Sequence, residues 1–233
     1  MRKIALIPAR SGSKRIPHKN IKLFCGKPII AYPIQTALES SIFDEVIVST
    51  DSQAIAQIAQ KYGAKVPFMR PKELSDDFTP TSSVAAHAIR MLHLKSDDML
   101  CVIYPTAPLL QIDTLKEGLE SLLKDNSKQF SFCAVMYEYN PMRSFYIRDD
   151  GIEMLFPAQY LIRSQDLEPL FHDAGQFYWG RASAWIENLP IFAPHSHAIV
   201  VSPYQAQDID VLADWELAEM KYKIAYDKLE QDK

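Results

Sequence analysis

The feature that most constrains this chain is a short apolar strand followed at once by a cationic loop. Residues 4–8 (IALIP) are small or β-branched and apolar, as expected of a buried strand. Gly12 lets the loop backbone approach a ligand, and neighbouring N–H groups and basic side chains attract anions. The polar and basic residues of this loop are Arg10, Ser11, Gly12, Ser13, Lys14, Arg15, Lys19 and Asn20. We therefore expect the loop to bind a polyphosphate and to open a nucleotide-binding α/β domain.

The loop matches neither of the common phosphate-binding patterns, GxxxxGK[ST] and GxGxxG, because Gly12 stands alone. The alternative interpretation is a cationic surface turn. The density of basic side chains directly after a strand favours anion binding over that alternative.

Composition excludes several classes of protein. The 233 residues, 48% of them hydrophobic, fit one α/β domain with a modest elaboration. The net charge of −4 argues against a general surface for nucleic acid or anionic membrane, and no apolar run approaches the roughly 20 residues of a membrane helix. Cys25, Cys101 and Cys133 are scattered and odd in number, unlike a disulfide framework. We expect a cytoplasmic protein that binds neither nucleic acid nor membrane.

Strand and helix patterns alternate along most of the chain. We predict strands at 4–8, 45–49, 65–69, 99–104 and 130–137, and helices at 29–40, 51–62, 84–94, 114–123 and 213–233. Repeated βαβ units predict a Rossmann-like α/β fold with a mostly parallel sheet covered by helices. Ligands of such sheets bind at the carboxyl ends of the strands, where the opening loop and residues 49–51 and 105–108 are expected.

The pattern changes in the segment from about 136 to 173. This segment consists of short aromatic and proline-containing stretches without a helical period, which favours a small antiparallel insertion. Its apolar content exceeds what a small exposed lobe should carry, so it either contacts a second subunit or packs as a flap on its own domain. We expect one domain, 1–233, with this lobe inserted.

Several polar residues follow predicted strands and have both a functional and a structural interpretation. Arg70 lies before a proline and would fork onto a phosphate or a base, or lie on the surface. Thr81, Ser82 or Ser83 would cap a helix or face a nucleotide. Thr106, in a Pro-rich turn, would contact a base or sugar, or only form the turn.

Asp208 and Asp210 alternate in an extended segment and therefore lie on the same side. Two adjacent carboxylates repel each other unless a cation lies between them, and Mg²⁺ with a triphosphate is the common solution. The alternative is that one of them caps the following helix. His172–Asp173 lacks a nucleophile motif, and His195 with His197 lacks a third metal ligand, so we assign no catalytic or metal role to these pairs.

Taken in order, these motifs resemble the CMP-sialic acid synthetase family, the cytidylyltransferases that activate nine-carbon acidic sugars. The resemblance runs nearly end to end. It rests on IPARSGSKRIPHKN, VIVSTDS, FMRPKEL, YPTAPL and QDIDVLADWELAE. Within the family, residues 75–89 and 163–180 are more similar to the pseudaminic acid cytidylyltransferases.

The resemblance implies a role for each matching position. Arg10, Ser13, Lys19 and Asn20 would hold the CTP phosphates and part of the nucleoside, with Lys19, Arg10 and Asp210 closest to the chemistry. Arg70 and Ser82 (or Thr81) would contact cytosine and ribose, and Asp208 and Asp210 would ligate Mg²⁺. The sugar pocket would comprise Tyr104, Thr106, Arg163, Gln165, Gln176, Phe177 and Tyr178. The resemblance also implies a homodimer in which the 136–173 lobe reaches the neighbour's site.

The expected reaction joins CTP to pseudaminic acid and releases pyrophosphate. Sialic acid enzymes of the family typically carry glutamine where this chain has Tyr104, and an Asn-Gly-Ala-type sequence where it has Asp173-Ala174-Gly175-Gln176. A tyrosine would suit a terminal methyl better than an amide would. The alternatives are synthetases of CMP-sialic acid, CMP-legionaminic acid or CMP-KDO, and a nucleotide-binding regulatory protein without turnover.

Overall fold

A central sheet of six strands organises the protein. A computed structural model describes residues 1–231, without the side chains beyond residue 225. The strands lie across the sheet in the order β10 (Ser196–Val200), β6 (Phe130–Met136), β9 (Phe171–Arg181), β5 (Met99–Ile103), β1 (Lys3–Pro8) and β4 (Glu45–Ser49). All neighbouring pairs are parallel except those that β9 makes with β5 and β6. This confirms the predicted mostly parallel sheet.

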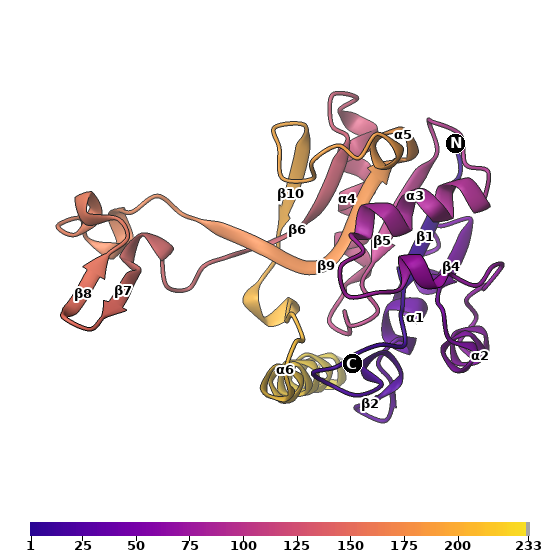
Figure 1. The fold of residues 1–233 in the computed structure, drawn as a ribbon, viewed down its shortest axis with the longest axis horizontal. Coiled ribbons are helices and arrows are strands. Elements are labelled where there is room, and N and C mark those ends of the chain that lie inside the picture. Colours follow the sequence, from indigo (N-terminus) through magenta and orange to yellow (C-terminus); the bar gives the residue numbers. More distant parts are fainter. Residues whose placement is uncertain (232–233) are drawn as a thin grey trace.

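Helices cover both faces of the sheet (Figure 1). They are α1 (Ala31–Ser40), α2 (Gln53–Lys61), α3 (Thr81–Met91), α4 (Ile112–Lys124), α5 (Ala182–Ile186) and α6 (Leu212–Gln231). Alternate residues of each strand face opposite sides, so Ala5 and Ile7 pack with α1, α2 and α4, whereas Ile4 and Leu6 pack with α3 and α5. The continuous apolar strands of the sequence thus become a sheet that is buried on both faces.

Local sequence sets where helix α2 begins and ends. The Ser52 side chain accepts a hydrogen bond from the backbone N–H of Ile55, which caps the first turn. Gly63 follows the helix with φ of +96°, a conformation that favours glycine.

The structure corrects several predicted elements. Residues 65–69 form no strand, only isolated bridges that pair Lys65 with Ile47 and Met69 with Thr50. Helix α3 begins at Thr81 rather than at 84, directly after Pro80. Helix α1 begins at Ala31, because residues 27–28 pair as β3 (Lys27–Pro28) with β2 (Leu23–Phe24). Strands β9 and β10 and helix α5 were not predicted from the sequence.

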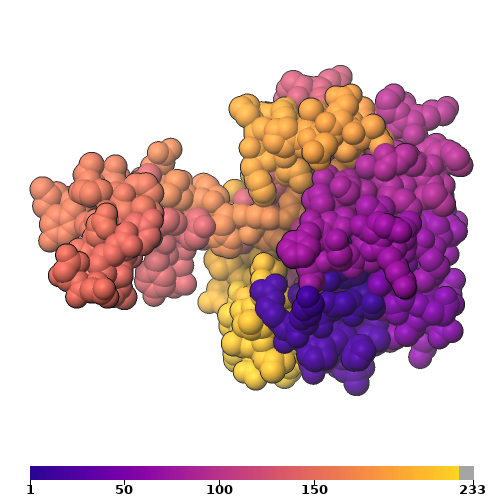
Figure 2. All heavy atoms as spheres, in the orientation of Figure 1, coloured from indigo at the N-terminus to yellow at the C-terminus, as the bar shows by residue number. Residues whose placement is uncertain are grey.

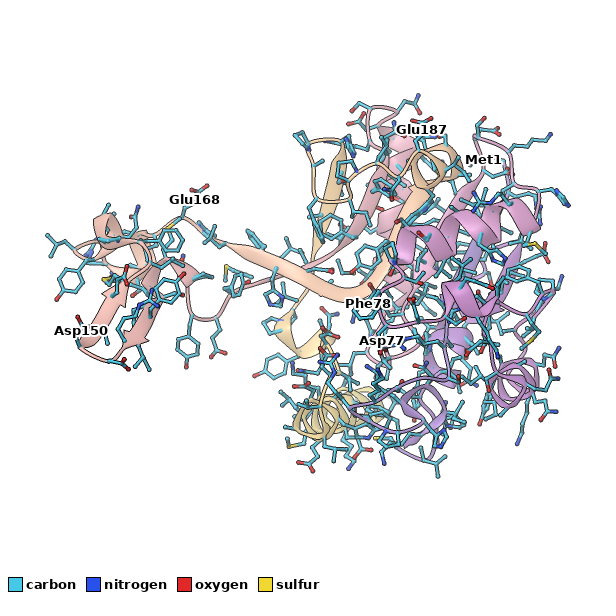
Figure 3. All side chains as sticks on the ribbon, viewed as in Figure 1. Met1, Asp77, Phe78, Asp150, Glu168 and Glu187 are labelled. Carbon is cyan, nitrogen blue, oxygen red and sulfur yellow. The ribbon has the colours of Figure 1, made fainter. Side chains whose placement is uncertain are left out.

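The inserted segment forms a lobe that stands clear of the body (Figures 1 and 2). Its hairpin pairs β7 (Phe145–Arg148) with β8 (Gly151–Met154) in antiparallel fashion, as the sequence predicted. Asp150 lies at the far end of the lobe and Glu168 near its return to the body (Figure 3). The ribbon enters the lobe from β6 and leaves it through β9, whose long strand runs back into the sheet.

Helix α6 packs against the segment that follows the cationic loop. Their shared cluster contains Ile16, Phe24, Tyr32, Ile209 and Trp215, and the ring of Phe24 meets the ring of Trp215 edge-on at 5.6 Å. This packing places residues 16–32 beside residues 209–218, indigo beside yellow in Figure 2. The last two residues of the predicted 213–233 helix lie outside the described residues.

Among the described residues, no helix combines the length and the apolar character needed to cross a bilayer.

Candidate active site

A cleft of about 400 Å³ opens at the carboxyl ends of β1 and β5. Its position agrees with the rule that ligands of parallel α/β sheets bind at this edge. The predicted site residues that line it are Arg10, Ser13, Lys14, Lys19, Asn20, Arg70, Thr81, Tyr104, Thr106 and Asp210. Five distant segments of the sequence therefore meet in one cavity.

Hydrogen bonds to neighbouring segments hold the cationic loop in shape. The backbone N–H and the hydroxyl of Ser11 both donate to the Asp51 carboxylate, at 2.8 and 2.7 Å. The Asn20 side chain donates to the carbonyl of Arg10 at 2.9 Å. A Cβ at Gly12 would lie 3.2 Å from an Arg10 nitrogen, so a larger residue would crowd that guanidinium. Ser11, Gly12 and Asn20 thus shape the loop that carries the charges.

Acidic side chains neutralise the loop cations in this structure. Arg10 and Lys14 pair with Asp77 at 2.6 and 2.5 Å, and Arg15 pairs with Asp210 at 2.7 Å. Asp77 lies near the middle of the face shown in Figure 3, next to Phe78, whose side chain is almost fully exposed. The cleft therefore places a cluster of cations where an anion can replace carboxylate partners.

Lys19 is the most enclosed cation of the loop. Its ammonium donates to the carbonyl of Ile209 at 2.6 Å and lies 3.8 Å from the Asp210 carboxylate. Burial lowers the pKa of Lys19, and the nearby Asp210 and Asp208 oppose this shift. The lysine connects the cationic loop to the acidic segment before α6.

Asp208 and Asp210 lie close enough to affect each other electrostatically. Loss of solvation and then the charge of Asp210 raise the pKa of Asp208. The cap of α6 is neither of these residues, because Asp214 accepts the backbone N–H groups of Asp210 and Val211, each at 2.9 Å. The two acids are therefore free of the structural role that the sequence left open.

Two carboxylates without a third form an incomplete metal site. Across residues 1–231, no group of three or more His, Cys, Asp or Glu residues is arranged to hold a metal ion. Mg²⁺ characteristically takes only one or two carboxylates and completes its shell with water and phosphate oxygens. The acidic pair beside the cationic loop fits that donor set.

Arg70 is a buried cation directed at the cleft. Its side chain is held beneath the surface, since the residue is only 5% exposed, and its backbone N–H donates to the carbonyl of Thr50 at 2.7 Å. The Nε and Nη2 atoms have no hydrogen-bond partner within the described part of the chain. Burial lowers the pKa of this guanidinium. An unpartnered buried guanidinium indicates a missing ligand.

The start of α3 and the turn after β5 supply the far wall of the cleft. Thr81, Tyr104 and Thr106 line it, whereas Ser82 does not. Thr81 Oγ1 lies 3.5 Å from the Tyr104 hydroxyl. Of the two hydroxyls predicted at the start of α3, Thr81 is therefore the one placed to meet a ligand.

The residues predicted for a sugar pocket lie farther apart than those predicted to bind the nucleotide. Tyr178 lies beside Tyr104, with ring centroids 5.4 Å apart, and Gln176 is buried and donates to the carbonyl of Gln205. Phe177 is fully buried and packs over Gly118 of α4, so its side chain belongs to the core and cannot contact a ligand in the cleft. Alternation along β9 explains this, because neighbours of a strand face opposite sides.

Arg163 and Gln165 lie in the protruding lobe and do not line the cleft of their own chain. Arg163 is exposed and pairs with Asp166 at 2.6 Å. This position agrees with the lobe predicted over about 136–173, and the long reach of β9 sets its distance from the cleft.

Three acids that organise the site were given no role of their own in the predictions from the sequence. Asp51 was expected at this edge of the sheet only as part of residues 49–51, and its carboxylate accepts hydrogen bonds from the Ser11 backbone N–H and hydroxyl. Asp77 and Asp173 were quoted within motifs without a role, and they bind the loop cations and the Tyr178 hydroxyl respectively. These three acids lie directly after or between strand-like segments, and that position is the feature of the sequence that could have indicated a role in the site.

Comparisons with known proteins agree with this geometry. A family model described as cytidylyltransferase matches residues 4–155. A pseudaminic acid cytidylyltransferase of Campylobacter jejuni is 45% identical, over 97% of this chain and 99% of that relative. A CMP-N,N'-diacetyllegionaminic acid synthase of Legionella pneumophila is 34% identical, over 94% of this chain and 95% of that relative. A solved CMP:2-keto-3-deoxy-manno-octonic acid synthetase in complex with CTP shares the fold, with a TM-score of 0.71, 17% identity and coverage of 97% and 100%.

Proposed function

Because the chain belongs to the cytidylyltransferase family, we propose that it joins CTP to pseudaminic acid and releases pyrophosphate. Family membership makes the protein a nucleotidyltransferase. The observation that carries the proposal is the cleft in which the cationic loop, the unpartnered Arg70 and Asp210 meet, with Asp208 next to Asp210 but outside the lining.

The cationic loop is suited to the triphosphate. Arg10, Lys14 and Lys19 supply charge, and the enclosed position of Lys19 makes its interaction with a phosphate stronger than at an exposed site. Arg70 also lines the cleft and offers two unpartnered nitrogens, Nε and Nη2, to the cytosine carbonyl or the ribose side. Thr81, at the start of α3, lines the same cleft and offers a hydroxyl.

Asp208 and Asp210 are the residues that would hold Mg²⁺. Their mutual repulsion and the raised pKa of Asp208 indicate a carboxylate pair that a hard cation would stabilise. When bound, a divalent ion neutralises phosphate charge and lowers the pKa of a coordinated hydroxyl. Arg15 and Lys19 form ion pairs with the Asp210 carboxylate. When that carboxylate binds a metal ion, the two cations would interact with the phosphates instead.

In the proposed mechanism, the anomeric hydroxyl of the sugar attacks the α-phosphorus in line and pyrophosphate leaves. The chain's contribution is positioning and charge neutralisation. Arg10 and Lys19 stabilise the charge that develops on the leaving pyrophosphate, and Tyr104 and Thr106 orient the sugar at the carboxyl end of β5.

Two observations favour pseudaminic acid over related acidic sugars as the substrate in this proposal. The pseudaminic acid relative is 45% identical, whereas the legionaminic acid relative is 34% identical and an N-acylneuraminate cytidylyltransferase of Escherichia coli is 30% identical. Tyr104 also lines the cleft where sialic acid enzymes typically carry glutamine. Its ring offers an apolar face to a terminal methyl.

We further propose that the protein works as a homodimer through its lobe. Large apolar side chains lie exposed there, with Ile147 at 83% and Leu161 at 88%, and a second subunit would cover them. Such a contact would bring Arg163 and Gln165 of one subunit toward the sugar side of the partner's cleft.

The free cysteines Cys25, Cys101 and Cys133 fit a reducing compartment, so we expect the reaction to be cytoplasmic.

The phosphate half of the proposal is tested by pyrophosphate release from CTP with Mg²⁺ in two variants. We expect Lys19→Ala and Asp210→Asn each to lower kcat/KM at least 100-fold, as loss of a charge-stabilising group does. Lys61→Ala, at the end of α2, removes an exposed lysine and is the matched control. Normal turnover in either cleft variant, with an unchanged circular dichroism spectrum, would contradict the assignment.

A further inference from the structure

The segment that carries Asp208 and Asp210 belongs to no helix or strand, and side chains from other elements hold it in place. Residues 206–211 connect the end of β10 to α6 (Figure 1). The Lys19 ammonium donates to the Ile209 carbonyl at 2.6 Å, and the buried Gln176 side chain of β9 donates to the carbonyl of Gln205, just before the segment. Whatever fixes the course of this segment therefore fixes the position of the two acids.

Helix α6 supplies a further anchor through Lys221. The Lys221 ammonium donates to the backbone carbonyl of Ala206 at 2.8 Å and to Oε1 of the Gln207 side chain at 2.9 Å. Nε2 of the same Gln207 amide donates to the backbone carbonyl of Asp208 at 3.0 Å. Two consecutive hydrogen bonds thus connect Lys221 to the backbone of one acid of the pair.

The ammonium of Lys221 also fixes which way the Gln207 amide lies. An ammonium can only donate, so the amide must present its oxygen to Lys221 and its NH2 group to the Asp208 carbonyl. Without that donor the amide could turn over, and its oxygen would then face the carbonyl oxygen of Asp208. The contact with Asp208 therefore depends on the lysine.

Asp214 and Lys221 together align the segment along α6. They are seven residues apart, so they lie on the same face of the helix, about 10.5 Å apart along its axis. Asp214 accepts the backbone N–H of Asp210, and Lys221 binds Gln207. Three residues of extended chain span at most about 10–11 Å, so the segment runs nearly extended and antiparallel to the helix. In an extended segment Asp208 and Asp210 point to the same side.

Lys221 acts in this contact as a hydrogen-bond donor rather than as half of an ion pair. Both of the oxygens that it binds are neutral. The side chain is partly buried, and burial lowers the pKa of Lys221. A partly desolvated ammonium bound to neutral oxygens is suited to holding the backbone in a fixed course.

We infer that Lys221 is a positioning residue that holds Asp208 and Asp210 in the arrangement in which they bind a divalent cation together. It acts through Gln207 and the backbone rather than on the two carboxylates. The inference rests on the proposed function, in which this acidic pair holds Mg²⁺.

The test measures Mn²⁺ binding to the full-length protein with CTP, with protein in excess over CTP, by electron paramagnetic resonance of the free ion. Lys221→Met keeps the length of the side chain but removes its donors. We expect the Kd for Mn²⁺ to rise about tenfold, as for other residues that orient metal ligands, and Lys221→Arg to recover most of that loss because it restores donors. Lys223→Met, at an exposed lysine of the same helix, is the matched control and should bind Mn²⁺ like the wild type.

Two further measurements distinguish positioning from a general loss of stability. In the metal-free protein, backbone amides of residues 206–211 should exchange faster in Lys221→Met, with the exchange of α6 unchanged. In turnover assays the Mg²⁺ concentration for half-maximal rate should rise, while kcat at saturating Mg²⁺ stays within about twofold of the wild type.

Wild-type Mn²⁺ affinity in Lys221→Met, or an equal loss in Lys223→Met, would overturn the inference and leave the proposed function standing. If Lys221→Met does not fold, Gln207→Leu removes the amide and keeps the lysine, and an unchanged Mn²⁺ affinity in that variant would overturn the inference as well. Asp210→Asn tests the site itself. Unchanged Mn²⁺ affinity in Asp210→Asn would show that the acidic pair does not hold the metal, which rejects that part of the proposed function and the inference with it.

Discussion

At the scale of single residues, the cleft is a balance of charges that a nucleotide must rearrange. Arg10 and Lys14 pair with Asp77, and Arg15 and Lys19 approach Asp210. A phosphate that binds one of these cations must replace its carboxylate partner. Asp77 and Asp210 therefore compete with the nucleotide and lower its affinity.

Asp77→Asn should therefore tighten CTP binding. The variant keeps the shape of the side chain but no longer competes with phosphate for Arg10 and Lys14. Exposed ion pairs are weak, so we expect the Kd to fall only roughly two- to fivefold, as measured by titration calorimetry. Asp76→Asn is the neighbouring control, because Asp76 bonds to its own turn instead. Weaker binding by Asp77→Asn would mean that Asp77 helps to hold the nucleotide.

Lys19 makes the affinity for CTP depend on pH. Its pKa is lowered by burial, so the ammonium loses its proton below the pH at which a free lysine does. Binding needs the protonated form, so affinity should be constant at lower pH and decline as pH rises through that pKa. Lys19→Arg should remove the decline, because a guanidinium stays protonated. Parallel pH profiles for the two proteins would assign the decline to another group.

The sequence revealed most of the residues that carry charge but not their partners. Arg10, Lys19, Arg70 and Asp210 were predicted because cations and acids after strands meet at one sheet edge. Phe177 was predicted with its neighbours, yet its burial depends on which face of β9 it occupies. That face is set by pairing with β5 and β6, which lie far away in sequence.

At the scale of elements, β9 is the strand on which the site and the core both depend. It runs antiparallel between β5 and β6, and its residues alternate between the cleft side and helix α4. The sequence analysis missed it because its polar start, His172 to Gln176, has no strand pattern, whereas the parallel strands were visible as continuous apolar runs.

Gly118 allows α4 to lie close to β9. A Cβ at this position would lie 2.8 Å from Phe177 Cε2 and 2.9 Å from Trp179 Cδ1, too near for buried rings to yield. We expect Gly118→Ala to destabilise the fold by about 1–3 kcal/mol in urea unfolding. Glu117→Ala, at the exposed neighbouring position of the same helix, should change stability by about 0.5 kcal/mol or less. Equal midpoints for the two variants would show that the helix can shift without cost.

At the scale of the whole molecule, the lobe is the part whose apolar surface a single chain leaves exposed. It stands away from the body, and its hairpin carries exposed apolar side chains (Figures 1 and 2). The sequence predicted an antiparallel insertion here, but its distance from the cleft depends on where β6 and β9 leave the sheet.

Ile152→Asp should weaken the proposed dimer. The side chain is 68% exposed on β8, and a charge there would be buried unpaired if a second subunit covers the hairpin. We expect light scattering to show monomer at concentrations where the wild type is dimeric, together with reduced turnover. Leu23→Asp, at an exposed apolar position on β2 and outside the lobe, should leave the mass unchanged. A monomeric wild type would contradict the dimer.

The central claim is that this cleft activates pseudaminic acid with CTP. The most direct measurement is pyrophosphate release with CTP and Mg²⁺, comparing pseudaminic acid with N-acetylneuraminic acid at equal concentration. We predict a strong preference for pseudaminic acid. A preference for N-acetylneuraminic acid would preserve the phosphate chemistry and contradict the sugar assignment built on Tyr104, and release with neither sugar would contradict the proposed reaction.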